Sequence, residues 1–379
     1  MDPWVREAAA GIARHAQREL EALVAVSSPS GDVHGAEEAV AVAAALVPDE
    51  ARVERIPCSS ADHAPDLLAR MPGAGGRRLL LLGHLDTVVP HDAHRPLHAV
   101  GDRLVGSGAV DMKGGVVLAL GILSFLARTA RTSFGEVALL LVCDEEWRTA
   151  PFFHAERFAG WNACLCFEAG QQGPAGEEGV VVRRKAAGTL RITAAGASAH
   201  SGSAPDRGRN ALLALAEAAR AIAACHDPSG PDRLTAVPTV MRSGEAFNVV
   251  PADGELYCDL RAERENAFDA VAAAVPAAVG GARLEAGFVR RWPGMDSHAA
   301  TAELLERASA ALGRPILAME RGGASDASHV ATRVPLTIDG LGPRGGGAHA
   351  PQEYVLAPSL RERAEVALAI AAALLDLRP

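Results

Sequence analysis

Histidines and carboxylates follow apolar runs at several points along the chain, and these residue types bind divalent metal ions. His84 comes directly after an apolar run of leucines, and Asp86 lies two residues further on. In an extended chain the two side chains point to the same side, so Asp86 can orient the ring of His84. A histidine bound to a metal usually donates its other ring N–H to such a partner. We therefore interpret His84 as a candidate metal ligand with its supporting carboxylate.

A glycine-rich loop and an acidic triplet offer further oxygen ligands. Asp111 stands in a loop whose glycines let the backbone approach a site closely, so this aspartate is placed to bridge two cations. Asp144, Glu145 and Glu146 follow a second apolar run directly. Three adjacent acids repel one another unless a cation lies among them. One carboxylate can then bind a metal ion while its neighbour acts as a base.

Glu168, after a third apolar run, and His349, in a late glycine-rich loop, complete the set. These residues gather at the carboxyl ends of predicted parallel strands, where open α/β sheets place their sites. Mixed nitrogen and oxygen ligands suit Zn²⁺, with Co²⁺ or Mn²⁺ as substitutes, and a shared aspartate is typical of a two-metal hydrolase. Taken alone, each segment also fits a structural role, such as a helix N-cap for Asp111.

Alternating buried strands and helices must position these residues. Apolar runs at 79–82, 137–142 and 164–167 predict strands that are covered on both faces, and 115–127 predicts a helix between the first two. This order predicts an α/β fold with a mainly parallel central sheet flanked by helices.

The sequence pattern changes near residue 180. Apolar and polar residues alternate at 189–194 and 256–261, and helices are expected at 210–224 and 266–278. This order indicates an inserted α+β domain. The expected domains are a discontinuous catalytic domain, 1–184 and 291–379, and the inserted domain, 185–290.

Composition excludes several classes of function. The 379 residues include 37 basic and 46 acidic side chains, a net charge of −9, which argues against nucleic acid or a membrane surface as partner. No uncharged apolar stretch of ~18 residues occurs, so we expect no membrane span. The charged N-terminal segment is unlike a signal peptide. The six cysteines form no CxxC pair, and we interpret them as small buried hydrophobes in a cytoplasmic protein.

In their order along the chain, these segments resemble the co-catalytic zinc metallopeptidase/deacylase family. That family includes glutamate carboxypeptidase, acetylornithine deacetylase, succinyl-diaminopimelate desuccinylase and aminoacylase-1. The resemblance is nearest to glutamate carboxypeptidase. The segments that carry the resemblance are 84–86, 108–115, 144–146, 167–168, 248–251, 321–326 and 349–355.

The resemblance implies a site with two Zn²⁺ ions and a cis peptide bond after Asp111. Glu145 would be the general base, taking a proton from a water that the ions activate to attack an amide carbonyl. Asp86 would hold His84 in place. The implied metal ligands are Asp111 on both ions, His84 and Glu168 on one, and Glu146 and His349 on the other.

The resemblance also implies that the inserted domain is a ferredoxin-like α+β unit that serves as a lid and a dimerisation surface. His200 matches a histidine that donates to the oxyanion and, in dimeric members, reaches the partner subunit's site, so we expect a homodimer through this domain. Asn248 and Arg261 match positions that hold the substrate, and an arginine can bind a carboxylate with two hydrogen bonds. Gly322 and Gly323 are expected to offer backbone N–H groups.

We therefore expect hydrolysis of an amide bond to an amino acid with a free carboxylate, in a small peptide or N-acyl amino acid. The enzyme would be a carboxypeptidase or an N-acyl-amino-acid deacylase. Alternatives are an aminopeptidase or dipeptidase of the same family, or a non-hydrolytic binding or transfer protein. Trp292 stands where glutamate carboxypeptidase has an arginine, so Arg290 or Arg291 replaces it or the pocket is apolar. Trp147 and Arg148 replace small residues, and their bulk is expected to reshape the mouth of the site.

Overall fold

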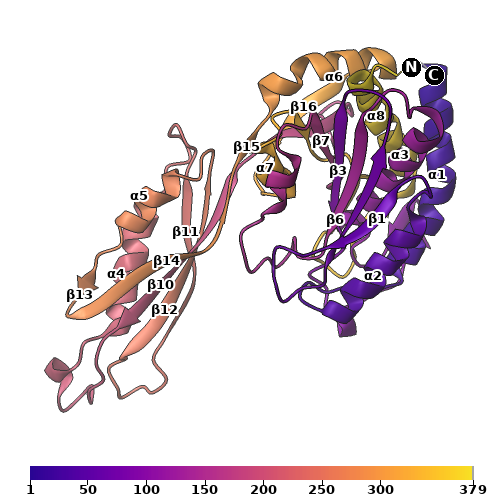
Figure 1. Ribbon diagram of the computed structural model, residues 1–379. Coiled ribbons are helices and arrows are strands. Elements are labelled where there is room, and N and C mark those ends of the chain that lie inside the picture. Colours follow the sequence, from indigo (N-terminus) through magenta and orange to yellow (C-terminus); the bar gives the residue numbers. More distant parts are fainter. Residues whose placement is uncertain (378–379) are drawn as a thin grey trace. The chain divides into compact units, whose positions relative to one another are not determined.

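A computed structural model describes residues 1–377, and the chain folds into two compact units (Figure 1). The first unit contains Met1–Arg183, Asp296–Glu320 and the chain from Ser325 onward. The second contains Arg184–Met295 and Arg321–Ala324. The predicted inserted segment, 185–290, lies inside the second unit.

The first unit is built around a six-stranded sheet in the order β1-β2-β6-β3-β7-β17. Strand β3 pairs in parallel with both β6 and β7, and β7 pairs in parallel with β17. The edge pairs β1–β2 and β2–β6 are antiparallel. The strands are β1 Arg52–Ile56, β2 Asp66–Pro72, β3 Arg78–His84, β6 Glu136–Val142, β7 Ala163–Cys166 and β17 Thr337–Ile338.

Helices cover both faces of this sheet, which is why its central strands are apolar throughout. Leu79 and Leu81 of β3 join the large apolar core with the helices α1, α3 and α8. Leu80 and Leu82 point to the opposite face and are buried too. The helices of this unit are α1 Pro3–Val24, α2 Val33–Leu46, α3 Gly114–Thr129, α6 His298–Leu312, α7 Asp326–Ala331 and α8 Ala357–Leu375.

Two smaller sheets and several short helical turns accompany the main sheet, and the last of these turns, η4, lies in the second unit. One sheet has the order β15-β9-β16, with β8 beside β9, and the other has the order β18-β19-β5-β4. Their strands are β4 His98–Val100, β5 Arg103–Val105, β8 Gln171–Gln172, β9 Glu178–Arg184, β15 Met295–Asp296, β16 Ile316–Arg321, β18 Gly345–Gly346 and β19 Tyr354–Leu356. The turns are η1 His91–Ala93, η2 Ala109–Lys113, η3 His154–Phe158 and η4 Pro205–Arg207.

The second unit has a five-stranded antiparallel sheet in the order β11-β12-β10-β14-β13. Its chain order is β-α-β-β-α-β-β, which is the predicted ferredoxin-like β-α-β-β-α-β order with the two-residue strand β13 added before the last strand. The helix predicted over 266–278 was too long, because α5 ends at Ala273 and Pro276 has no N–H to continue a helix. The elements are β10 Ala186–Ala195, α4 Ala211–Ala223, β11 Thr235–Ser243, β12 Asp253–Ala262, α5 Ala267–Ala273, β13 Ala278–Val279 and β14 Ala282–Trp292.

The structure bears on two expectations drawn from composition, one about membrane-spanning segments and one about the cysteines. The segment Ala109–Thr129 is long and apolar enough to cross a membrane by length and composition, although it includes Asp111 and Lys113. Because 83 % of its apolar window is buried inside the protein, it has the character of a core helix. All six cysteines are free thiols and five of them are buried, as expected for small buried hydrophobic residues.

Candidate active site

Two groups of three potential metal ligands share Asp111 and lie in the first unit. One group is His84, Asp111 and Glu168, and the other is Asp111, Glu146 and His349. Within each group the nitrogen and oxygen atoms lie within 4.8 Å of one another. Zinc binds such ligands at about 2.0–2.2 Å, which sets ligand atoms on one ion roughly 3–4 Å apart. The spacing of both groups therefore fits a divalent ion.

Asp111 presents one carboxylate oxygen to each group. Its Oδ1 lies 3.2 Å from Nε2 of His84, and its Oδ2 lies 3.2 Å from Nε2 of His349. His349 Nε2 also lies 3.2 Å from Oε2 of Glu146, and His84 Nε2 lies 3.8 Å from Oε1 of Glu168. This division of the two oxygens is what a bridging carboxylate requires. The peptide bond between Asp111 and Met112 is cis.

The carboxylates of this site are crowded, and within the described chain Glu146 has a buried oxygen without a hydrogen bond. Burial raises the pKa of Glu145 well above its usual range, and the nearby carboxylates of Glu168 and Asp326 raise it further. Burial likewise raises the pKa of Glu146. Among the described residues 1–377, nothing hydrogen-bonds to the buried Oε1 of Glu146. Buried acids with an unused oxygen are stabilised by a cation, so these residues fit the expected metal ions.

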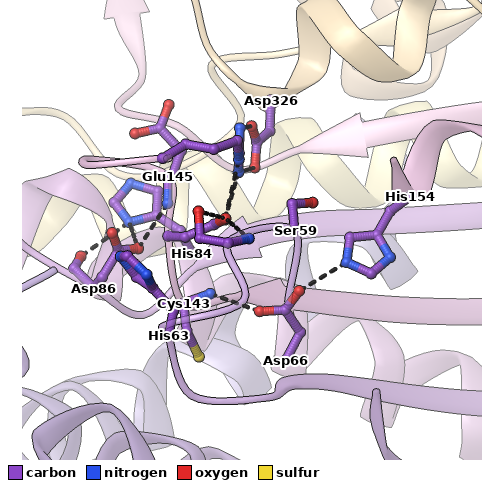
Figure 2. Close-up of polar contacts among 12 residues, drawn as sticks. Ser59, His63, Asp66, His84, Asp86, Cys143, Glu145, His154 and Asp326 are labelled. Atoms are coloured by element: carbon purple, nitrogen blue, oxygen red, sulfur yellow. Dashed lines mark hydrogen bonds and ion pairs between the residues drawn. The ribbon is translucent and has the colours of Figure 1, made fainter. Parts of the chain in front are cut away.

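Asp86 supports both the histidine and the acidic loop. Nδ1 of His84 lies 3.0 Å from the backbone oxygen of Asp86 and 3.4 Å from its Oδ1. The Asp86 carboxylate also accepts the backbone N–H groups of Glu145, at 3.2 Å, and Glu146, at 3.0 Å. Figure 2 shows Asp86 beside His84, with Glu145 close by. Asp86 therefore fixes the directions of two neighbouring segments at once.

Asp144, the first acid of the triplet, belongs to neither ligand group. Its carboxylate accepts from the backbone and hydroxyl of Ser60 and from Arg148. The guanidinium of Arg148 also binds Asp326 with two hydrogen bonds of 2.5 and 2.9 Å. The expectation that Arg148 adds bulk at the mouth of the site was wrong, because its side chain is only 2 % exposed and compensates two buried aspartates. Trp147 is the exposed member of that pair, at 72 %.

A buried pair that sequence reasoning missed holds the start of the acidic loop. Nε2 of His154 lies 2.8 Å from Oδ2 of Asp66, and Oδ1 of Asp66 accepts the backbone N–H of Cys143 at 2.9 Å (Figure 2). Asp66 and His154 are 88 residues apart and follow no metal-site spacing, so no signal in the sequence connected them.

The five remaining predicted residues lie in the second unit, and their part in the site stays a prediction. Nδ1 of His200 accepts the backbone N–H groups of Gly202 and Ser203, which leaves Nε2 as the ring nitrogen that carries the proton when His200 is neutral. The Asn248 segment lies beside it, because the backbone oxygen of Asn248 accepts the N–H of Ser201 at 3.0 Å. Both side chains are on exposed residues, so both are available to a ligand.

Arg261 is already paired, since its Nε and Nη2 each lie 3.0 Å from an oxygen of Asp259. Gly322 and Gly323 are exposed, and the carbonyl of Gly323 accepts from Arg184.

The residues around Trp292 were expected to replace a missing arginine or to form an apolar pocket. Arg291 is bound to Asp269 with two hydrogen bonds of 2.6 and 3.2 Å. The guanidinium of Arg290 lies 5.5 Å from the centre of the Trp292 ring, whose side chain is buried.

Paired ligand groups that share one aspartate, at the strand ends of an α/β sheet, define a metal-dependent hydrolase. The sequence model of peptidase family M20/M25/M40 matches residues 80–373, so the chain belongs to this family of metallopeptidases and amidohydrolases. This match confirms the resemblance drawn from the sequence and the predicted enzyme class. The function follows at the level of the family, as metal-dependent hydrolysis of amide bonds.

Relatives and solved structures agree with this assignment. Carboxypeptidase G2 from Pseudomonas sp. (strain RS-16) is 26 % identical over 356 residues, which cover 89 % of this chain and 83 % of that protein. Succinyl-diaminopimelate desuccinylase from Methylobacterium sp. (strain 4-46) is 33 % identical, but the match covers only 55 % of this chain and 57 % of that protein.

The structure of the aminopeptidase PepT from Bacillus cereus ATCC 10987 has a TM-score of 0.77 at 19 % identity, covering 96 % of this chain and 98 % of that one. The M20 family metallo-carboxypeptidase Sso-CP2 from Sulfolobus solfataricus has a TM-score of 0.73 at 15 % identity, covering 96 % of this chain and 99 % of that one. These likenesses confirm the predicted fold.

Proposed function

We propose that this protein hydrolyses the amide bond to an amino acid with a free carboxylate, as a carboxypeptidase or an N-acyl-amino-acid deacylase. The observation that carries the proposal is the pair of ligand groups that share Asp111. The proposed base, Glu145, is held next to the ligand Glu146 by the hydrogen bond from its backbone N–H to Asp86. The 26 % identity to carboxypeptidase G2 over most of both chains supports the same substrate class.

Two Zn²⁺ ions are the proposed cofactors, with Co²⁺ or Mn²⁺ as substitutes. His84, Asp111 and Glu168 would hold one ion, and Asp111, Glu146 and His349 would hold the other. When bound, such ions polarise a carbonyl and make a water more acidic. The unused oxygen of Glu146 supports this assignment.

Glu145 is the proposed general base. It would accept a proton from the attacking water and deliver it to the departing amine. Its backbone N–H is held by the Asp86 carboxylate, which fixes the start of its side chain. Nε2–H of His200 would donate to the developing oxyanion. Asn248, Arg261 and the N–H groups of Gly322 and Gly323 would hold the substrate carboxylate, with Arg261 exchanging its partner Asp259 for the substrate.

We further propose a homodimer formed through the second unit, in the cytoplasm. Strand β11 is an edge of its sheet and exposes Val237, Val240 and Met241, and α4 exposes Leu213. An edge strand with apolar side chains favours pairing with another chain. The free cysteines support a reducing compartment. Light scattering on the purified protein measures the oligomeric state directly.

The proposed activity is tested by a hydrolysis screen on protein loaded with Zn²⁺, with and without a chelator. The substrates are N-acetyl, N-formyl, N-benzoyl and dipeptidyl derivatives of Glu, Asp, Arg, Leu and Phe. Chelator-sensitive release of an acidic amino acid supports the glutamate-carboxypeptidase class, and release of Leu or Phe supports a deacylase with an apolar pocket. Hydrolysis only of peptides with a free amine would favour an aminopeptidase or dipeptidase. No hydrolysis with two ions bound would favour a non-hydrolytic protein.

A further inference from the structure

Glu353 is a buried carboxylate that contacts the backbone of the Asp111 loop at several points. Its side chain is part of a residue only 2 % exposed. Oε1 accepts the N–H groups of Val110, at 2.8 Å, and Asp111, at 2.9 Å, and Oε2 accepts the N–H of Gly108 at 2.9 Å. The backbone oxygen of Glu353 accepts a further N–H, from Gly106, at 3.0 Å. One residue thus binds four donors between residues 106 and 111.

The loop needs these acceptors because its backbone departs from a helix. Gly108 has φ +70°, and Asp111 has φ −125° and ψ 90°, neither of which continues a helical ladder. Buried N–H groups without an acceptor are costly, so a partner from another part of the chain is required. Glu353 lies 242 residues beyond Asp111 in the sequence and provides that partner.

Glu353 is also joined to the second ligand-bearing segment. His349 lies four residues before it, and a turn connects them, since the N–H of Glu353 binds the oxygen of Ala350 and the N–H of Ala350 binds that of Gly347. Strand β19 follows directly and pairs with β5, which leads into the Asp111 loop. The same short segment therefore carries His349 and holds Asp111.

We propose that Glu353 is a positioning residue for metal binding, which fixes Asp111 and His349 relative to each other through the backbone N–H groups of the Asp111 loop. This inference rests on the proposed metal site. Glu353 belongs to neither ligand group, and its carboxylate accepts backbone N–H groups, so it acts through the Asp111 loop and the turn to His349. Groups that orient metal ligands in this way typically change metal affinity by 10- to 100-fold when they are replaced.

The test is the affinity of the apo-protein for Zn²⁺, measured by competition with a chromogenic chelator, and the visible absorption of the Co²⁺-loaded protein. In Glu353→Gln the amide nitrogen of the new side chain meets an N–H of the loop, donor against donor. We expect Zn²⁺ affinity to fall by about 10- to 100-fold and the Co²⁺ spectrum to change. Glu353→Asp, which keeps the charge and withdraws the carboxylate by one methylene, gives the same test if Glu353→Gln does not fold.

Glu178→Gln is the matched control. Glu178 is 5 % exposed in the same unit, and its carboxylate binds the guanidinium groups of Arg363, Arg344 and Arg314, none of which is a proposed metal ligand. This variant is expected to lower the free energy of unfolding while Zn²⁺ affinity stays unchanged. Wild-type Zn²⁺ affinity in both Glu353 variants would overturn the inference and leave the proposed function intact. Failure of the unsubstituted protein to bind two ions would instead overturn the proposed function, and the inference with it.

Discussion

Arg148 and Asp326, 178 residues apart in the sequence, form a buried ion pair with two hydrogen bonds of 2.5 and 2.9 Å. The same guanidinium binds Asp144, the neighbour of Glu145. Through this one cation, the start of helix α7 is joined to the loop that carries the proposed base. Figure 2 shows Asp326 on the same side of the site as Glu145, whose carboxyl it influences electrostatically.

Replacing Arg148 is expected to destabilise the protein strongly. Arg148→Gln leaves two buried aspartates without their cation, and loss of one partner from a buried ion network typically costs about 3–5 kcal/mol. Urea unfolding monitored by circular dichroism measures the change. Arg333→Gln, which breaks the exposed pair with Glu156, is the control and should leave the unfolding midpoint unchanged. Equal midpoints for both variants would contradict the compensating role of Arg148.

Replacing the proposed base should remove turnover while the metal stays bound. Glu145→Gln keeps the shape of the side chain but cannot accept a proton, so kcat is expected to fall by about 10²- to 10⁴-fold. Metal analysis should still find the wild-type ion content, because Glu145 belongs to neither ligand group. Glu21→Gln, on the exposed part of α1, is the control. Full turnover in Glu145→Gln with both ions present would exclude Glu145 as the base.

The shared ligand predicts a difference in metal content between variants. His84→Ala removes one ligand of a single group, so we expect one ion to remain. Asp111→Ala removes a ligand from both groups, and we expect both ions to be lost. Elemental analysis after gel filtration gives the number of ions per chain. If Asp111→Ala retained one tightly bound ion, the sharing of Asp111 would be disproved.

His200 acting on the partner subunit predicts complementation between two inactive variants. His200→Ala and Glu145→Gln should each be inactive alone. In a mixed dimer, the intact Glu145 of one chain meets the intact His200 of the other, and random mixing should restore about a quarter of the wild-type activity. Activity assays after joint unfolding and refolding provide the measurement. No recovery, with mixed dimers demonstrated by mass, would place His200 in its own subunit's site or outside it.

His329 predicts a loss of stability in acid. Burial, with the nearby charge of Arg148, lowers the pKa of His329 to about 3. Below about pH 6.5, His329 becomes protonated in the unfolded chain but stays neutral in the folded chain. The free energy of unfolding therefore falls as the pH drops, by up to about 1.4 kcal/mol per pH unit. The difference in unfolding free energy between wild type and His329→Gln should shift in that direction from pH 7 to pH 5. A constant difference would refute the prediction.

The candidate site residues that could be predicted from the sequence are those that lie close together along the chain. His84 and Asp86 are two residues apart at the end of one strand, and Glu145 and Glu146 are adjacent at the end of another. Local spacing and the apolar runs before them were sufficient to predict a site at the ends of the strands. The α/β fold followed from the same runs, because a strand that is apolar on both faces needs covering layers.

Contacts between distant segments could not be predicted in this way. Glu353 was noticed only as part of a resemblance, and its bonds to the Asp111 loop depend on the pairing of β19 with β5. Arg148 was taken for bulk because its partner Asp326 belongs to a distant helix. No alternation or spacing encodes such partners, since each depends on how the sheet brings its connections together.

The two ligand groups differ in their access to solvent, which predicts that ions bound by them exchange with solvent at different rates. The side chain of His84 is 1 % exposed, whereas that of His349 is 53 % exposed. In the proposed two-ion site, an ion held by His349 would face solvent on one side, while an ion held by His84 would be enclosed by buried side chains. We therefore expect the enclosed ion to exchange more slowly than the outer one, and a chain that is short of metal to keep the enclosed ion longer.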